Sequence, residues 1–297
     1  MPRPLHVPID DPLEIAAWMR RVLDQGATPH LFTFPSSALR LCEAAVAAGI
    51  DLGGAQFTVG GEPVTDARLK GISKSGAHAA PRYGSMECGP IGYGCLAPTV
   101  SDDTHLQHDL HALIQPGAST TLPADALFIT ALHPRSPFTL FNVSMGDRAT
   151  LSTRPCGCPL EKLEWTTHVH SIRSFEKLTA GGMTFFDTDV IRVLEEELPA
   201  HFGGSGSDYQ LVEQEMPDGS PGLSLLIDPA LGSLDATAVI HFFTERIGGS
   251  SSVERMMGTM WRESGFVTVK RRAPLATNAG KVLHLHSAPG SHLTPSG

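Results

Sequence analysis

The stretch PRYGSMECGPIGYGC, Pro81 to Cys95, decides how the middle of this chain folds. It contains four glycines, two prolines, two cysteines and a single carboxylate, Glu87. Glycine costs backbone entropy in a helix and proline lacks the amide donor that a helix needs, so this composition excludes a helix. We therefore expect a glycine-rich loop that carries Glu87.

The composition is that of an ordinary globular protein. Of the 297 residues, 41% are hydrophobic and 18% are charged, which supports a real core and argues against wholesale disorder. The formal net charge of −9 disfavours a nucleic-acid partner, because phosphate binding needs a basic face. No signal-peptide pattern opens the chain, and no apolar run is long enough to span a bilayer. We expect a soluble, cytoplasmic protein without a membrane partner.

Helix and strand patterns alternate along the chain and predict a mixed α/β and α+β fold. Apolar spacing predicts helices over 10–23, 36–50, 187–198 and 235–248, and strands over 55–59, 127–134, 138–151, 208–215, 222–228 and 265–272. The strand pattern at 138–151 is expected to end in the polar pair Gly146 and Asp147. After the strand at 55–59, the sequence Gly60-Gly61-Glu62-Pro63 is either a tight turn or a place where a ligand approaches the backbone.

Five motifs in a fixed order carry a resemblance to a known family. They are GGEP (60–63), RYGSMECGP (82–90), NVSMGD (142–147), IRSFEKLTAGGMTF (172–185) and APLATNAGK (273–281). The set resembles the C-terminal portion of adenylate-forming acyl-CoA synthetases, in the phenylacetate–coenzyme A ligase branch. The resemblance implies a partial α/β domain over 1–171, a small mobile α+β domain over 172–286 and a flexible tail over 287–297.

The resemblance assigns nucleotide contacts to four parts of the chain. By position these are the turn at Gly61, Glu62 and Pro63, the pair Tyr83 and Gly84, the ribose-binding Asp147, and Arg173 at the hinge between the domains. Glu87 matches a glutamate that helps to hold Mg²⁺, a hard cation that prefers oxygen ligands. Lys281 matches the catalytic lysine. The alternative for Glu87 is that it caps the following turn, and the alternative for Lys281, on spacing alone, is a solvated loop charge.

The sequence departs from the family pattern at three places. Met86 stands where the family usually has Thr or Ser, and Phe175, followed by Glu176, stands where its hinge usually has aspartate. The glycine-rich loop that binds the ATP phosphates lies upstream in the family and has no counterpart here. The expected forms are a split ligase with a complementing N-terminal subunit, a truncated ligase, or a repurposed remnant.

The five cysteines suggest a separate metal site. Cys95, His105, Cys156 and Cys158 offer three thiolates and one imidazole, which is a donor set of structural zinc sites. His108, His111, His168 and His170 are alternative donors, and reduced inert cysteines are the alternative without metal. Cys42 lies within a predicted helix as a core residue.

Two functions remain open from the sequence. The first is ATP-dependent activation of an aryl, phenylacetate-like carboxylic acid and its transfer to coenzyme A, with ATP/AMP, Mg²⁺ and possible structural Zn²⁺ as cofactors. The second is a non-catalytic nucleotide-binding or partner module derived from such a ligase. Retention of Asp147, Arg173 and Lys281 favours the first, and the missing phosphate loop favours the second.

Overall fold

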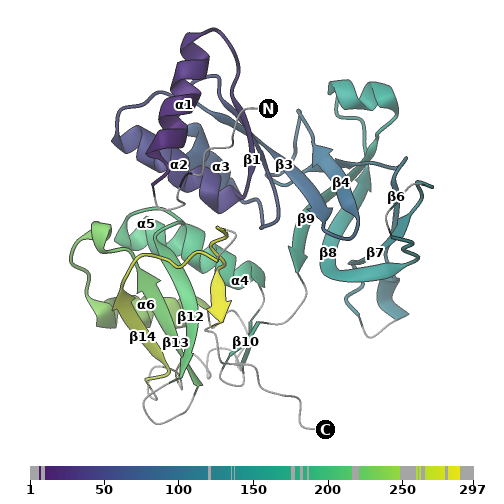
Figure 1. Ribbon diagram of the computed structural model, residues 1–297. Helices are drawn as coiled ribbons and strands as arrows, with labels where there is room; N and C mark the ends of the chain where they lie inside the picture. Colours follow the sequence, from purple (N-terminus) through teal and green to yellow (C-terminus); the bar gives the residue numbers. More distant parts are fainter. Residues whose placement is uncertain are drawn as a thin grey trace. The chain divides into compact units, whose positions relative to one another are not determined.

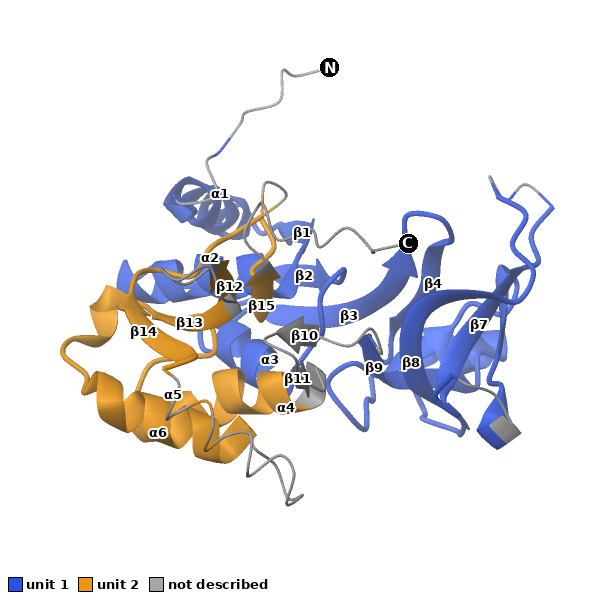
Figure 2. Ribbon diagram, turned by 90° about the horizontal axis from the view of Figure 1, so that it is seen from below, with its two compact units in different colours: residues 1–176 blue, residues 177–297 orange. Residues whose placement is uncertain are grey.

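A computed structural model of the chain describes residues 7, 11–119, 122–134, 136, 138–174, 178–180, 183–185, 187–215, 221–247, 259, 261, 265–277 and 280–287. The chain divides into two compact units, residues 1–176 and 177–297 (Figure 2). We expected the boundary after residue 171; strand β9 (Thr167–Ser174) carries the first unit beyond that point because it pairs within the first sheet. The hinge residues Phe175 and Glu176 lie outside the described residues.

The first unit is built on a nine-stranded mixed sheet of order β1-β2-β3-β4-β5-β9-β8-β7-β6 (Figure 1). Strands β1, β2 and β3 run parallel, and the later neighbours are antiparallel. The other bounds are β1 (His30–Thr33), β2 (Gln56–Val59), β3 (His78–Ser85), β4 (Gly89–Gly94), β5 (Thr104–Leu106), β6 (His111–Ile114), β7 (Ala126–Ala131) and β8 (Val143–Thr153).

Three helices pack beside the parallel strands (Figure 1). They are α1 (Leu13–Asp24), α2 (Pro35–Ala47) and α3 (Asp66–Ser73), and short 3-10 turns lie at Gly117–Ser119 and Pro159–Leu163. Phe57 and Val59 of β2 are buried in one cluster with apolar residues of all three helices. The alternate residues Gln56 and Phe32 are exposed. The helices therefore cover one face of β1–β3, since side chains alternate between the faces of a sheet.

The stretch from Pro81 to Cys95 forms the hairpin of β3 and β4. Tyr83 pairs with Gly92, and the register shifts between Tyr83 and Gly84. A Cβ atom at Gly84 would lie 2.5 Å from the carbonyl oxygen of Gly89, so the strands approach too closely there for any other residue. The glycines that exclude a helix therefore form a tight antiparallel hairpin, and Glu87 lies on its turn.

The second unit contains a four-stranded sheet of order β14-β13-β12-β15. Its described elements are the hairpin β10 (Leu178–Ala180) and β11 (Met183–Phe185), α4 (Asp187–Arg192), a π-helix (Val193–Glu197), α5 (Leu198–Phe202), β12 (Tyr209–Glu215), β13 (Pro221–Ile227), a 3-10 turn (Pro229–Leu231), α6 (Ala236–Ile247), β14 (Val267–Arg271) and β15 (Leu285–Ser287). Val193, Leu194, Leu225 and Phe243 belong to its buried core.

The predicted fold class is confirmed, but the structure also contains elements that the sequence did not predict, among them β1, α3, β3, β4 and β9. The helix expected over 187–198 contains a π-helical turn and runs on to Phe202. Strand β8 begins later than expected, at Val143, and places Asp147 within the strand. The predicted tail lies outside the described residues except for Ser287, which ends β15. None of the helices in the described parts of the chain is both long and apolar enough to cross a membrane.

Candidate functional site

The turn at Gly60–Pro63 lies against β3. A Cβ atom at Gly60 would collide with the carbonyl oxygen of Arg82, and Gly61 has a φ of 79°. The Glu62 carboxylate accepts hydrogen bonds from the N–H of Ser36 at 3.0 Å and from its hydroxyl at 2.9 Å. It also forms a 2.8 Å ion pair with Arg68, in which both side chains are at most 4% exposed. The Glu62 carboxylate is committed to the fold, so a ligand would meet this turn through its backbone.

Tyr83 and Asp147 are in direct contact. The hydroxyl of Tyr83 donates a 2.8 Å hydrogen bond to Asp147 Oδ2. Tyr83 is only 8% exposed, and its burial, together with the nearby Asp147 carboxylate, raises the pKa of the phenol. Tyr83 therefore acts as a neutral donor that orients the carboxylate of Asp147.

Arg173 lies on the strand next to that of Asp147: β8 and β9 pair at Asp147 with Ser174 and at Arg148 with Arg173. Its guanidinium forms a 3.0 Å ion pair with the buried Asp102. The structure thus brings Tyr83 and Asp147 into contact and places Arg173 on the adjoining strand, where its side chain is held by Asp102.

Glu87 and Met86 lie on the exposed turn of the β3–β4 hairpin, directly after Gly84 and Ser85. Met86 is 93% exposed, and Glu87 is also exposed. The turn is held by the Ser85 hydroxyl, which accepts a 3.0 Å hydrogen bond from the N–H of Cys88. Glu87 is therefore on a surface turn, as predicted, where its carboxylate can reach a cation.

Lys281 belongs to the second unit and lies on the loop before β15. Its N–H donates to Thr277 Oγ1 at 3.1 Å, and its carbonyl accepts from the Thr277 N–H at 2.8 Å. The fully buried amide of Gln210 holds both ends of this loop. Gln210 Nε2 donates to the carbonyls of Leu275 at 2.9 Å and Leu283 at 2.8 Å, and its Oε1 accepts from the Leu275 N–H at 2.6 Å.

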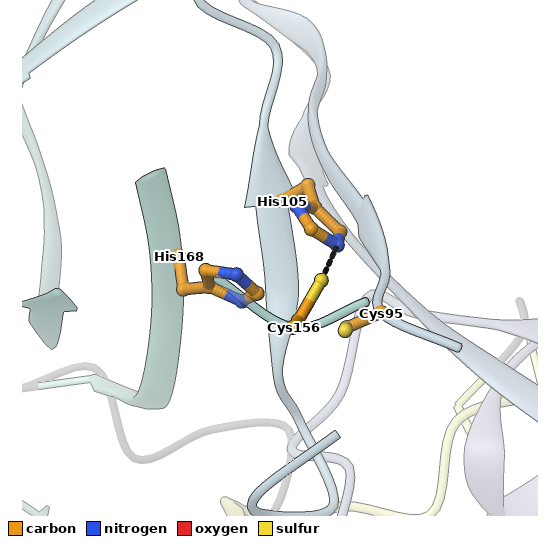
Figure 3. Close-up of side chains that lie close together, drawn as sticks. All are labelled: Cys95, His105, Cys156 and His168. Carbon is orange, nitrogen blue, oxygen red and sulfur yellow. Dashed lines mark hydrogen bonds between the residues drawn. The ribbon is translucent and has the colours of Figure 1, made fainter. Parts of the chain in front are cut away.

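The Cys/His cluster, which comprises Cys95, His105, Cys156, Cys158 and His168, lies in the first unit. Cys95, His105, Cys156 and His168 each offer one donor atom, and these atoms lie within 4.8 Å of one another (Figure 3). His105 Nε2 is 3.7 Å from Cys156 Sγ and 3.2 Å from Cys158 Sγ. Metal–ligand bonds of about 2.0–2.3 Å imply donor separations of roughly 3.3–3.8 Å in a tetrahedral zinc site. The separation between His105 and Cys156 falls within this range, and the one between His105 and Cys158 lies just below it.

Both histidines of the cluster are held as metal-bound histidines usually are. His105 Nδ1 lies 2.6 Å from the Trp165 carbonyl oxygen, and His168 Nδ1 lies 2.7 Å from Asp103 Oδ1. These contacts place the proton on Nδ1 and leave Nε2 as the donor to a metal. His168 Nε2 is buried and has no hydrogen-bond partner within the described part of the chain. A metal ion fits this orphaned nitrogen and the surrounding sulfur donors.

Within the Cys/His cluster, the thiols of Cys95 and Cys158 have pKa values shifted in opposite directions. Burial of Cys95 raises its pKa. Burial would also raise the pKa of Cys158, but hydrogen bonds from the backbone N–H groups of Leu96 and Leu160 outweigh it and lower that pKa to about 6. The Glu161 carboxylate accepts hydrogen bonds from the N–H groups of Cys156 and Gly157 and so fixes the Cys-x-Cys turn.

The buried carboxylate of Asp103 orients one histidine of the cluster, His168, through a hydrogen bond. Asp103 is fully buried; burial would raise its pKa, but the Thr99 N–H, His168 and Arg154 lower it below its usual value. The sequence analysis singled out neither Asp102 nor Asp103, and it named His168 only as an alternative metal donor. The pattern His168-Val169-His170 could have indicated a histidine face on a strand, and so His168 as a metal donor, because alternate residues of a strand share one face.

The fold is shared with solved ligase structures. The amide bond synthetase McbA from Marinactinospora thermotolerans has a TM-score of 0.50 and 15% identity, over 92% of this chain and 53% of that chain. The anthranilate CoA ligase AuaEII, in complex with anthranoyl-AMP, has a TM-score of 0.56 and 11% identity, over 94% and 52%. The ATP-bound RpMatB-BxBclM chimera B1 has a TM-score of 0.52 and 14% identity, over 92% and 52%.

The chain therefore has the fold of these proteins and spans about half of their length. No model of a protein family and no curated protein matches the sequence.

Proposed function

We propose that the chain binds an adenine nucleotide in its first unit and takes part in the ATP-dependent activation of a carboxylic acid. The observation that carries this proposal is the hydrogen bond between Tyr83 and Asp147, which belong to two separate motifs, with Arg173 on the strand that pairs with that of Asp147. The fold shared with an anthranilate CoA ligase in complex with anthranoyl-AMP supports it.

Each candidate residue has a role that its chemistry suits. Asp147 accepts hydrogen bonds from the ribose hydroxyls, since a carboxylate takes two donors at once. Arg173 and the backbone at Gly61–Pro63 contact the rest of the nucleotide. Glu87 is the candidate ligand of Mg²⁺, which offsets the charge of the ATP phosphates when bound.

In the proposed reaction, a carboxylate oxygen of the acid attacks the α-phosphorus of ATP, and the bond from that phosphorus to pyrophosphate breaks. Lys281 stabilises the negative charge that develops in this step. The thiol of coenzyme A then attacks the acyl carbon and displaces AMP, forming a thioester. We propose a phenylacetate-like aryl acid as substrate and the cytoplasm as location, with a complementing N-terminal ligase subunit as the source of the phosphate loop.

The Cys/His cluster is proposed as a structural zinc site. Cys95, His105 and Cys156 belong to it in the sequence prediction and in the structure. His168 and Cys158 compete for the fourth position. Zinc bound here would fasten β4, β5, β9 and the Cys-x-Cys turn to one another, and its binding free energy would stabilise the fold.

A second candidate, a non-catalytic nucleotide-binding or partner module, is favoured by Met86. Its thioether is 93% exposed on the hairpin turn where the related enzymes usually carry a hydroxyl. This candidate keeps the nucleotide contacts of Asp147 and Arg173 and drops the role of Lys281.

ATP–pyrophosphate exchange distinguishes the two candidates. The purified chain is assayed with Mg²⁺ and a panel of aryl and fatty acids, and its AMP affinity is measured by calorimetry. Exchange above background supports the ligase, and AMP binding without exchange supports the module. A folded chain that neither exchanges pyrophosphate nor binds AMP would refute both.

A further inference from the structure

The segment Ser101–Asp103, directly before β5, contacts three separate parts of the first unit. The Ser101 hydroxyl donates to the carbonyl of Val64, next to the Gly60–Pro63 turn, at 3.2 Å. Asp102 is 5% exposed and Asp103 is fully buried. Buried carboxylates are costly unless they are paired and hydrogen-bonded, so the partners of these two residues show what the segment holds in place.

Asp102 holds an irregularity in β9. Arg148 pairs with Arg173, and Thr150 with His170, so Ser171 and Ile172 lie opposite the single residue Ala149. Two residues facing one define a β-bulge, and Ser171 has a φ of 55°, which is unusual for a residue other than glycine. Asp102 Oδ1 accepts from the Ser171 N–H at 2.9 Å, and Oδ2 accepts from the Ile172 N–H at 2.8 Å.

The same carboxylate reaches the arginine that follows the bulge. Asp102 Oδ2 accepts a 3.0 Å hydrogen bond from Arg173 Nη1. A bulge re-aims the side chains of its strand, and one held in a sparsely populated conformation persists only when its surroundings fix it. Asp102 thus fixes both the backbone that presents Arg173 and the direction of its guanidinium.

The next residue, Asp103, connects the same segment to the Cys/His cluster. Its Oδ1 lies 2.7 Å from His168 Nδ1, and its Oδ2 accepts hydrogen bonds from the Thr99 N–H at 2.9 Å and from Arg154. His168 and Arg173 lie on the same strand, β9. The adjacent carboxylates of Asp103 and Asp102 therefore hold two residues of β9. Asp103 holds the candidate metal donor His168, and Asp102 holds Arg173, a candidate nucleotide-binding residue.

We propose that Asp102 is a positioning residue for Arg173, and that the Asp102–Asp103 pair couples metal occupancy of the Cys/His cluster to nucleotide affinity. The proposal rests on the proposed function for its nucleotide arm. Metal bound at His168 fixes Asp103, the adjacent Asp102 keeps the bulge in place, and Arg173 is presented to the nucleotide. Because coupling between the affinities of two binding sites is reciprocal, bound AMP should in turn raise the affinity for the metal, measured as a smaller fraction of metal transferred to a competing chelator at equilibrium.

The first test is Asp102→Asn, which keeps the shape of the side chain and removes its charge. In the zinc-loaded protein, we expect the Kd for AMP to rise roughly ten-fold, because the interaction energies of residues in direct contact are typically of this size. The zinc content should stay unchanged. The amides of Ser171 and Ile172 should exchange faster with deuterated water. Asp109→Asn is the matched control, because Asp109 is an exposed carboxylate on the turn after β5. It should change neither quantity.

The second test removes zinc from wild type and from Asp102→Asn with a chelator. The Kd for AMP should rise at least about five-fold in wild type, the lower range of ordinary coupling, and by less in the variant. Equal AMP affinity and equal Ser171 and Ile172 exchange in wild type and Asp102→Asn would overturn the proposal. An equal effect of zinc removal in both proteins would overturn the coupling.

Failure of the proposed function has a different signature. A wild-type chain that binds no AMP would remove the nucleotide site. Amide exchange at Ser171 and Ile172 would still show whether Asp102 holds the bulge, because that measurement needs no nucleotide.

Discussion

Tyr83 and Asp147, 64 positions apart, are joined by a 2.8 Å hydrogen bond from the phenol to Oδ2 of the carboxylate. The phenol is buried and the strand carrying Asp147 is central in the antiparallel part of the sheet, so the carboxylate is held in place before any ligand arrives. A preorganised acceptor loses less entropy when it binds a ribose.

Asp147→Ala should therefore weaken AMP binding. Hydrogen bonds to a charged group contribute about 1.5–3 kcal/mol each, so the loss of both ribose contacts should raise the Kd by at least roughly 100-fold. Asp147→Asn is the informative partner, because it keeps an oxygen for the Tyr83 hydroxyl but offers a ribose fewer acceptor sites. Both changes are measured by calorimetry with AMP. Unchanged affinity in a folded Asp147→Ala protein would remove the ribose assignment.

A metal in the Cys/His cluster gives a second prediction. Cys156→Ser should lower both the zinc content and the Tm, because structural zinc contributes its binding free energy to folding. Cys88→Ser is the control: Cys88 is a buried free cysteine that lies outside the cluster. Metal analysis of the purified proteins and thermal unfolding give the two readouts. Wild-type protein that takes up no zinc would end the metal assignment.

The same cluster allows a sharper comparison between its fourth donors. His168→Asn should lower zinc affinity by more than about 100-fold if His168 ligates the metal, exceeding the effect of changing an outer-shell residue. Cys158→Ser should have that effect if the thiolate is the ligand instead. Competition with a chromophoric chelator measures both affinities, and the larger loss identifies the ligand.

The sequence predicted the fold well where the signal was local. Helical spacing and strand alternation located four helical segments and six of the strands, and the glycines around Glu87 indicated a region without helix, but strands such as β1, β3, β4 and β9 were not predicted. The bulge at Ser171, the Asp102–Arg173 ion pair and the orientation of His168 by Asp103 were not predictable, because each depends on strand register between distant segments. The resemblance assigned the turn at Glu62 to the nucleotide through its backbone groups and gave no role to the Glu62 carboxylate, whose buried pairing with Arg68 depends on how α3 packs.

The thiol of Cys158 should titrate at a low pH in metal-free protein, where its pKa is about 6. An unfolded cysteine has a pKa of about 8.5, so the unfolded chain binds more protons between these two values. The stabilisation from this thiolate is fully present above the unfolded pKa and is lost as pH falls through the folded pKa. Thiolate absorbance should show a low-pH step that Cys158→Ser removes. A wild-type titration confined to the ordinary thiol range would contradict this.

Gln210→Leu should detach the loop that carries Lys281. The substitution removes the buried amide that bonds the backbone at Leu275 and Leu283, and these orphaned polar groups should cost about 3 kcal/mol of unfolding free energy. Chemical denaturation measures this loss, and amide exchange at Lys281 should speed up. If Gln210 positions Lys281, pyrophosphate exchange should fall while AMP affinity stays constant, and Gln210→Leu combined with Lys281→Ala should be no slower than Lys281→Ala alone. Normal exchange kinetics in Gln210→Leu, despite the lower stability, would make Gln210 a residue of the fold only.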